Sequence, residues 1–138
     1  MRIFFGINLV PTSTYGFRIY VRGAALKPHL DNYKRRILGS IINVDKNVDE
    51  DWPLEIYDNN GKLHRIYLEP GEIFMYESAR LIHSRITPLN GDYYTNIYLH
   101  YLPELYELEV YNWEEKMFLE EGVNTELDYI KGQIFNDK

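Results

Sequence analysis

Hydrophobic residues in the first 103 positions occur in short bursts of aromatic and β-branched residues, separated by clusters of Gly, Pro, Asn and Asp. Branched and aromatic side chains favour strands, whereas the separating residues favour turns. Helical periodicity is weak over this region. The pattern therefore predicts eight strands, at Ile3–Leu9, Tyr15–Val21, Arg36–Val44, Leu54–Tyr57, Leu63–Leu68, Ile73–Tyr76, Leu81–Arg85 and Tyr93–Tyr101.

Three dipeptides between the predicted strands carry specific turn signals. Asn60-Gly61 predicts a two-residue hairpin loop, Pro70-Gly71 fits the centre of a type II turn, and Asn90-Gly91 predicts a further turn. Eight short strands with this spacing indicate a mainly β domain, either a sandwich, a jelly roll or a barrel.

The pattern changes near Pro103. Leu105, Leu108, Val110 and Trp113 are set among Glu and Lys residues, which suits an amphipathic helix better than a strand. We therefore expect residues 1–103 to form a β core and residues 104–138 to form an acidic, helical C-terminal segment packed on it.

Composition narrows the class of protein. A chain of 138 residues that is 45% hydrophobic can bury one substantial core, so a single compact unit is expected. Cysteine is absent, which excludes disulfides, thiolate nucleophiles, iron–sulfur clusters and Cys-bound zinc. The N-terminal residues do not resemble a signal peptide and no segment approaches a membrane span, so we expect a cytoplasmic protein without a membrane partner.

The formal net charge of −6 is unevenly distributed. Residues from Glu104 onward hold ten of the 21 acidic and three of the 15 basic residues, which leaves 11 acidic and 12 basic residues in positions 1–103. Neither part carries the basic field of a duplex-binding protein, so no nucleic-acid partner is expected.

Candidate metal chemistry comes from three residues. On an extended strand the side chains of residues i and i+2 point the same way, so His29 and Asp31 can meet one cation. His83, on the apolar segment Leu81–Arg85, is the candidate third ligand. Two histidines and one carboxylate on one face of a metal leave positions open for a bidentate cosubstrate and O2, as in non-haem Fe(II) oxygenases. A chance His-x-Asp, with His83 as a hydrogen-bonded core residue, explains the same residues without a metal.

The surrounding residues resemble a known family. The stretch Tyr20-x-x-Gly23-x-x-Leu26-x-x-His29-x-Asp31 is similar to a motif of the prolyl 4-hydroxylase group of Fe(II)/2-oxoglutarate dioxygenases. The resemblance extends over roughly residues 15–103 and includes the segments 36–45, 52–58, 69–74 and 76–91. It implies a double-stranded β-helix, a jelly-roll fold like that of the cupins. It also implies that iron binds His29, Asp31 and His83, and that 2-oxoglutarate and O2 are consumed as a C–H bond is hydroxylated.

Two positions depart from the family motif, and both concern the cosubstrate. Leu26 replaces a tyrosine whose hydroxyl helps to hold 2-oxoglutarate, and Tyr93 stands where a lysine or arginine is expected. A dicarboxylate in an apolar cavity still needs a cation. Strand alternation aims Arg85 to the same side as His83, so we expect its guanidinium to clamp the distal carboxylate, with Tyr93 adding a hydrogen bond.

Further residues complete the expected site. Arg18 is the alternative clamp, because it shares a strand face with Tyr20, which we expect to face the metal cavity. His64 and His100 fall outside the motif and are interpreted as structural or exposed, and Asn96 is left without a role.

The leading hypothesis is therefore a small 2-oxoglutarate-dependent hydroxylase acting on a prolyl peptide, a protein or a small molecule. A peptide groove is expected to be reduced or supplied by a second subunit, so a homo-oligomer is possible. The alternative is a cupin-like barrel that binds a metal or another ligand without catalysis. A third hypothesis is a structural β domain that assembles through its acidic helices.

Overall fold

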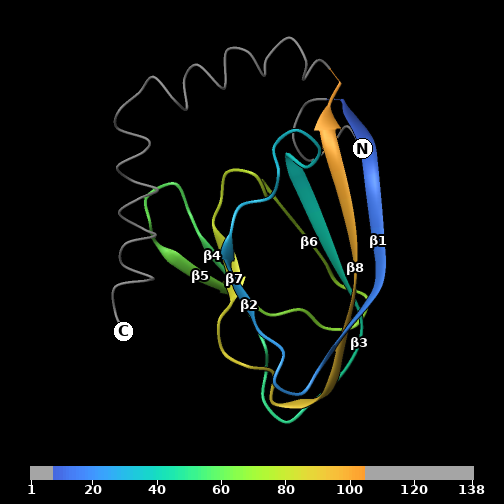
Figure 1. Cartoon of the computed structure of the whole chain (residues 1–138), viewed down its shortest axis with the longest axis vertical. Helices are drawn as coiled ribbons and strands as arrows, with labels where there is room; N and C mark the ends of the chain where they lie inside the picture. The colour runs from blue at the N-terminus through green and yellow to red at the C-terminus, as the bar shows by residue number, and fades with distance from the viewer. Residues whose placement is uncertain (1–7, 105–138) are drawn as a thin grey trace.

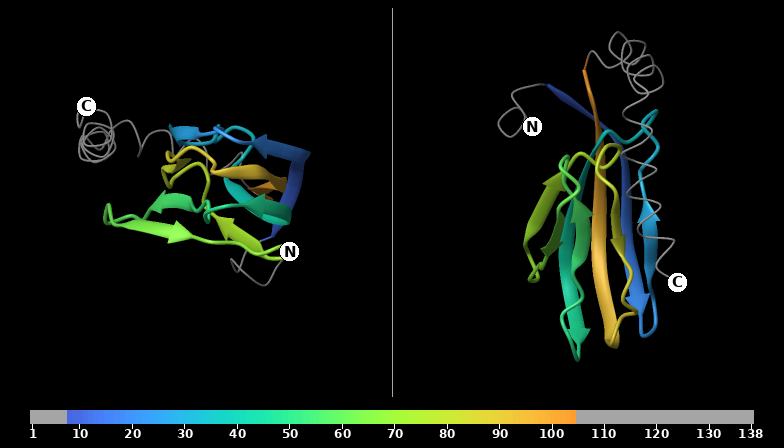
Figure 2. Two further views of the ribbon diagram at one scale, coloured as in Figure 1. Left: turned by 90° about the horizontal axis from the view of Figure 1, so that it is seen from below. Right: turned by 90° about the vertical axis from the view of Figure 1, so that its left-hand side faces the viewer.

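The computed structural model describes residues 8–104, which form two antiparallel four-stranded sheets (Figure 1). In the first sheet the strand order is β1-β8-β3-β6, with bounds Leu9–Val21, Gly91–Pro103, Leu38–Val48 and Ile73–Tyr76. In the second sheet the order is β2-β7-β4-β5, with bounds Leu26–His29, His83–Arg85, Leu54–Tyr57 and Leu63–Ile66. Figure 2 shows the sheets as two layers.

The chain passes from one sheet to the other at every connection except the β4–β5 hairpin. This connectivity is consistent with the expected jelly roll, and the prediction of a mainly β fold is confirmed. Within residues 8–104, no helix is long and apolar enough to cross a membrane. The predicted helical segment 104–138 and most of the predicted strand Ile3–Leu9 lie outside the described residues.

Strand alternation explains how the core forms. In β4, Leu54 and Ile56 are buried between the sheets, whereas Glu55 and Tyr57 on the other face are half-exposed. One core cluster joins both sheets and consists of Ile41, Leu54, Ile56, Leu68 and Tyr76. Burial of each large aliphatic side chain contributes roughly 1.5–3 kcal/mol, so this cluster holds the two layers together.

Two sequence predictions about local structure need correction. The Asn60-Gly61 dipeptide does not form a two-residue loop, because the β4–β5 connection spans residues 58–62. There the Asp58 carboxylate accepts hydrogen bonds from the backbone N–H groups of Asn60 and Lys62, and Gly61 takes a φ of 76°. The second correction concerns β2. The hydrophobic pattern did not predict a strand at Leu26–His29. Pro28 lies within it, and proline lowers the strand signal.

Strand β8 is central to the placement of the site because it pairs with both β1 and β3. Its first residue, Gly91, lies against β3, where a Cβ would come within 2.4 Å of the Val48 Cα. Only glycine fits this close approach. From there β8 directs Tyr94, Asn96, Tyr98 and His100 toward the second sheet.

Candidate metal centre

Three potential ligands come together on the second sheet. His29 ends β2 and lies directly opposite His83 of β7 in the antiparallel register, with their ring centroids 4.3 Å apart. Asp31 follows two residues after His29. One ligand atom of each of His29, Asp31 and His83 lies within 4.8 Å of the others. The convergence predicted for residues 29, 31 and 83 is therefore present in the fold.

Both histidines are oriented in the same way by the backbone. The Nδ1 of His29 lies 2.8 Å from the Lys27 carbonyl oxygen, and the Nδ1 of His83 lies 2.9 Å from the Leu81 carbonyl oxygen. A carbonyl can only accept, so each Nδ1 carries the proton and donates it. The Nε2 lone pair of each ring is left for a cation, which is the tautomer that metal-binding histidines use.

Asp31 is held by contacts on its backbone and on its carboxylate. Its backbone N–H donates to the Ser78 carbonyl at 2.9 Å, which fixes the chain just after β2. Its Oδ1 lies 3.9 Å from the His29 Nε2, and its Oδ2 lies 3.3 Å from the His100 Nε2. Burial raises the pKa of Asp31, but hydrogen bonding by His100 and the proximity of His83 outweigh it, and the pKa is lowered. The carboxylate is thus in its metal-binding form at neutral pH.

The charge state of His83 also suits a metal ligand. Burial lowers the pKa of His83 to about 4, and the neighbouring His29 adds to this effect. His83 is only 3% exposed. Its imidazole is therefore neutral well below neutral pH, and a neutral imidazole is the form that coordinates a cation.

A cavity of about 140 Å³ opens beside these three residues. Both sheets contribute to it. Its walls are formed by Tyr15, Arg18, Tyr20, Leu26, His29, Asp31, Arg36, Ile41, Leu54, Tyr76, His83, Tyr98 and His100. The side chain of His29 is 37% exposed, so the cluster is accessible from this side.

The structure brings Arg18 and Tyr20 to this cavity, as their shared strand face predicted. The Arg18 guanidinium lies 5.5 Å from the centre of the Tyr20 ring. The Tyr20 and Tyr98 hydroxyls are 2.9 Å apart, and the amide of Asn96 donates to Tyr98 at 3.1 Å. Burial is the main reason that the pKa of Tyr98 is raised, so the Tyr98 hydroxyl stays protonated at neutral pH.

Arg85 points between the sheets, as strand alternation predicted, but it does not line the cavity. Its guanidinium is stacked between Trp52 and Tyr94, 4.5 and 4.7 Å from the two ring centres. Its Nη1 donates to the Trp52 carbonyl. Its Nη2 is buried and has no hydrogen-bond partner among the described residues. A buried N–H without an acceptor costs roughly 1–3 kcal/mol, so this nitrogen is suited to meet an anion.

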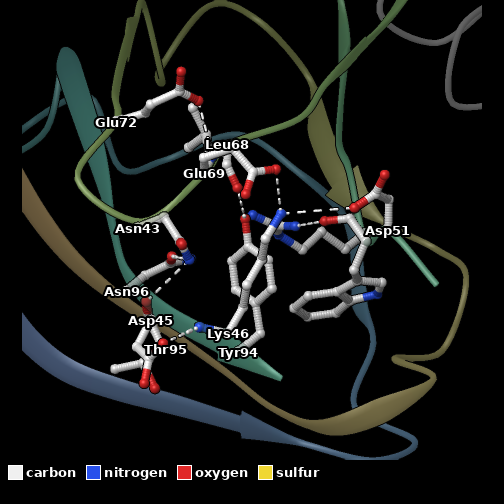
Figure 3. A network of polar contacts seen from close by, with 12 residues as sticks. Asn43, Asp45, Lys46, Asp51, Leu68, Glu69, Glu72, Tyr94, Thr95 and Asn96 are labelled. Atoms are coloured by element: carbon white, nitrogen blue, oxygen red, sulfur yellow. Dashed lines mark hydrogen bonds and ion pairs between the residues drawn. The ribbon is translucent and has the colours of Figure 1, made fainter. Parts of the chain in front are cut away.

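A network of polar residues surrounds Tyr94 (Figure 3). Lys46 bridges Glu69 and Asp51, with its Nζ at 2.7 and 3.6 Å from their carboxylates. It is therefore already neutralised and is not a free cation for a ligand. On the other side of Tyr94, Asn43 donates to Asn96 at 3.2 Å.

Tyr93 does not lie where the sequence analysis expected it. Its neighbour Tyr94 faces the interior, so strand alternation turns Tyr93 to the opposite face of β8. There its hydroxyl donates to the Asp45 carboxylate at 2.8 Å. Tyr93 is absent from the cavity walls. The prediction that Tyr93 donates a hydrogen bond to a bound cosubstrate is therefore wrong.

His100 was not predicted to be part of the site. Its side chain is 7% exposed, lines the cavity and contacts Asp31, so it is neither exposed nor remote from the candidate ligands. Its position in the strand could have indicated this role, because His100 shares a face of β8 with Tyr98 and Asn96. His64 does behave as a structural residue, since it pairs with Asp58 at 2.8 Å in the β4–β5 hairpin.

No protein-family model matches the chain, and no curated protein matches it. Several solved structures resemble it, among them two oxygenases. A Pseudomonas putida prolyl-4-hydroxylase is 20% identical with a TM-score of 0.55, over 74% of this chain and 56% of that protein. The nickel complex of the non-haem monooxygenase ThoJ is 16% identical with a TM-score of 0.52, over 71% of this chain and 46% of that protein. The chain thus spans about half the length of each, and it has a fold related to those of these two oxygenases.

Proposed function

We propose that this protein is an Fe(II)- and 2-oxoglutarate-dependent dioxygenase. The observation that carries the proposal is the convergence of two histidines and one partly buried carboxylate beside a cavity between the two sheets. Three ligands on one face of a cation leave further coordination positions open on the cavity side. The related folds of a prolyl-4-hydroxylase and a non-haem monooxygenase support it.

The residues present fit a divalent transition metal. Two neutral imidazoles and one carboxylate form a nitrogen and oxygen donor set that suits iron, and the Nδ1 contacts to backbone carbonyls orient both rings. In this proposal His29, Asp31 and His83 hold the metal. When bound, iron together with 2-oxoglutarate and O2 supplies the oxidation of an unactivated C–H bond.

The cosubstrate needs a cation for its distal carboxylate. Arg85 is buried between the sheets, and Arg18 and Arg36 line the cavity, where Arg36 already contacts Tyr15. We assign the contact to Arg85, because its buried Nη2 lacks an acceptor among residues 8–104. Arg18 is the alternative, because it already lines the cavity. The Tyr20 and Tyr98 hydroxyls supply donors beside Leu26, where the family motif has a tyrosine.

We propose a prolyl peptide, a protein or a small molecule as the substrate. The prolyl-4-hydroxylase neighbour supports a prolyl substrate, but this chain covers only 56% of that protein. A peptide therefore needs binding surface beyond the cavity described here, and a second subunit is one source of it.

The direct test of the function is turnover. Anaerobically purified protein is loaded with Fe(II) and 2-oxoglutarate, O2 is admitted, and succinate is measured. We expect succinate from the wild-type protein and none above background from His83→Ala. Wild-type protein that binds iron and 2-oxoglutarate but forms no succinate with any candidate substrate would contradict the proposal.

One alternative function has specific observations in its favour. Leu26 lines the cavity in place of a tyrosine, and Tyr93 faces away from it. Both changes remove contacts that would hold 2-oxoglutarate, which favours a barrel that binds a metal or another ligand without catalysis. Iron-loaded protein that fails to bind 2-oxoglutarate in an equilibrium titration would support this alternative.

A further inference from the structure

His100 occupies a buried position between the candidate ligand Asp31 and strand β1. Its Nε2 lies 3.3 Å from the Asp31 Oδ2, and its Nδ1 lies 3.3 Å from the Ser13 Oγ. The Tyr15 ring packs against it nearly at right angles, with ring centroids 5.6 Å apart. The His100 imidazole is therefore held at both nitrogens and contacted by the Tyr15 ring.

These partners assign the protons of His100. A carboxylate can only accept, so the Nε2 of His100 carries a hydrogen and donates it to Asp31. In the neutral ring the Nδ1 is then an acceptor, and the Ser13 hydroxyl is able to donate to it. Asp31 therefore selects the tautomer of His100, and Ser13 holds the second nitrogen of the same ring.

The two oxygens of Asp31 have different neighbours. Its Oδ1 lies on the side of the His29 Nε2, at 3.9 Å, and its Oδ2 lies on the side of His100. A carboxylate with one oxygen held in this way cannot rotate freely, so the other oxygen keeps its direction toward the two cluster histidines. Partners of this kind orient metal ligands and raise metal affinity.

We propose that His100 is a positioning residue for metal binding, which holds the Oδ2 of Asp31 so that the Oδ1 faces the cation, with Ser13 holding the far nitrogen of the His100 ring. The proposal rests on the metal-binding part of the proposed function and does not require 2-oxoglutarate turnover. Tyr15 supports the same arrangement, because Arg36 donates to its hydroxyl at 2.5 Å and stacks on its ring.

The test is the affinity of the metal-free protein for Zn2+, measured by competition with a chelating dye. We expect His100→Leu to weaken Zn2+ binding about 10- to 100-fold, the usual effect of losing such a partner. His100→Gln keeps an N–H donor and should recover most of the affinity. Ser13→Ala should weaken binding by a smaller factor, because it removes only the contact that holds the far nitrogen of the His100 ring.

A second readout reports geometry rather than affinity. The visible absorption spectrum of the Co2+-loaded protein depends on how the ligands are arranged, so it should change in His100→Leu and return toward wild type in His100→Gln. His64→Leu is the matched control, because His64 also pairs with an aspartate but lies in the β4–β5 hairpin. It should leave both the Zn2+ affinity and the Co2+ spectrum unchanged.

The outcomes separate this proposal from the proposed function. Unchanged Zn2+ affinity and an unchanged Co2+ spectrum in folded His100→Leu overturn the role of His100 alone. If His100→Leu does not fold, Ser13→Ala decides, and wild-type affinity in that variant overturns the proposal. Wild-type protein that binds metal but forms no succinate leaves the role of His100 standing and refutes the oxygenase. Wild-type protein that binds no metal refutes both.

Discussion

The two cluster histidines differ in how they meet solvent. His83 is 3% exposed, whereas the side chain of His29 is 37% exposed. In the proposed metal site, a ligand would therefore approach from the side of His29, and His83 would supply a neutral nitrogen from the interior. Burial that lowers the pKa of His83 to about 4 also keeps this ligand free of competing protons at neutral pH.

One prediction concerns which arginine, Arg85 or Arg18, binds the distal carboxylate of 2-oxoglutarate. Arg85→Ala should weaken 2-oxoglutarate binding by at least about 10-fold, since a buried charge partner is lost, while Fe(II) binding stays unchanged. An equilibrium titration of the iron-loaded protein under anaerobic conditions measures both. If Arg18→Ala weakens binding and Arg85→Ala does not, the assignment moves to Arg18.

A second prediction concerns the buried amides behind the cavity. Asn96 is fully buried and contacts Asn43 and Tyr98. Asn96→Leu should lower the free energy of unfolding by about 1–3 kcal/mol, because both partners lose a hydrogen bond inside the protein. Urea denaturation measures it. Asn47→Leu, at an exposed position, is the control and should change stability by less than about 0.5 kcal/mol.

Among the elements, β8 combines structure and function. It joins β1 to β3 in the first sheet and carries Tyr98 and His100 into the cavity. Its inward face was not predictable from alternation along residues 93–101, because both faces carry aromatic residues, and Tyr93 was expected on the cavity side but lies on the opposite face. The role of His100 was not predictable, because it depends on a contact across 69 positions of sequence that no local pattern encodes.

A substitution at Gly91, the first residue of β8, tests how closely this strand packs against β3. Gly91→Ala places a methyl group against the backbone of β3, 2.4 Å from the Val48 Cα, at a φ of 157°. The backbone conformation alone should cost about 1–3 kcal/mol, and the clash adds to it. Gly23→Ala is the matched control, because Gly23 also has a positive φ but no atom within 4 Å of the added Cβ. Equal losses in thermal denaturation would contradict the close packing of β3 and β8.

Other elements show where sequence patterns reach their limit. Strands β4 at Leu54–Tyr57 and β6 at Ile73–Tyr76 were predicted with the observed bounds, because each is a short run rich in strand-favouring residues between turn-forming residues. Strand β2 was missed, because four residues with a proline give little signal, yet it positions His29. Spacing correctly suggested the cluster of residues 29, 31 and 83. It could not show that stacking on Trp52 and Tyr94 keeps Arg85 out of the cavity wall.

At the scale of the molecule, the metal site lies where the two layers meet. His29 and His83 belong to the second sheet and His100 to the first, so a bound cation is linked to both through Asp31. Metal binding should therefore stabilise the whole fold. At a free Zn2+ concentration 100 times the Kd, the gain is about 2.7 kcal/mol.

This stabilisation is measurable as a shift in Tm. Wild-type protein should melt roughly 5–20 °C higher with Zn2+ than with a chelator, since about 1 kcal/mol corresponds to roughly 2–8 °C in domains of about 60–250 residues. His83→Ala should show no shift, because its remaining ligands bind weakly. A shift of equal size in His83→Ala would place the bound metal elsewhere.

The most direct measurement is the iron content of the protein after anaerobic loading with Fe(II) and removal of free metal, for the wild type and for His29→Ala, Asp31→Ala and His83→Ala. One iron per wild-type chain and near-complete loss in each variant is the predicted result. Equal iron content in the wild type and the three variants would show that these residues do not form the metal site.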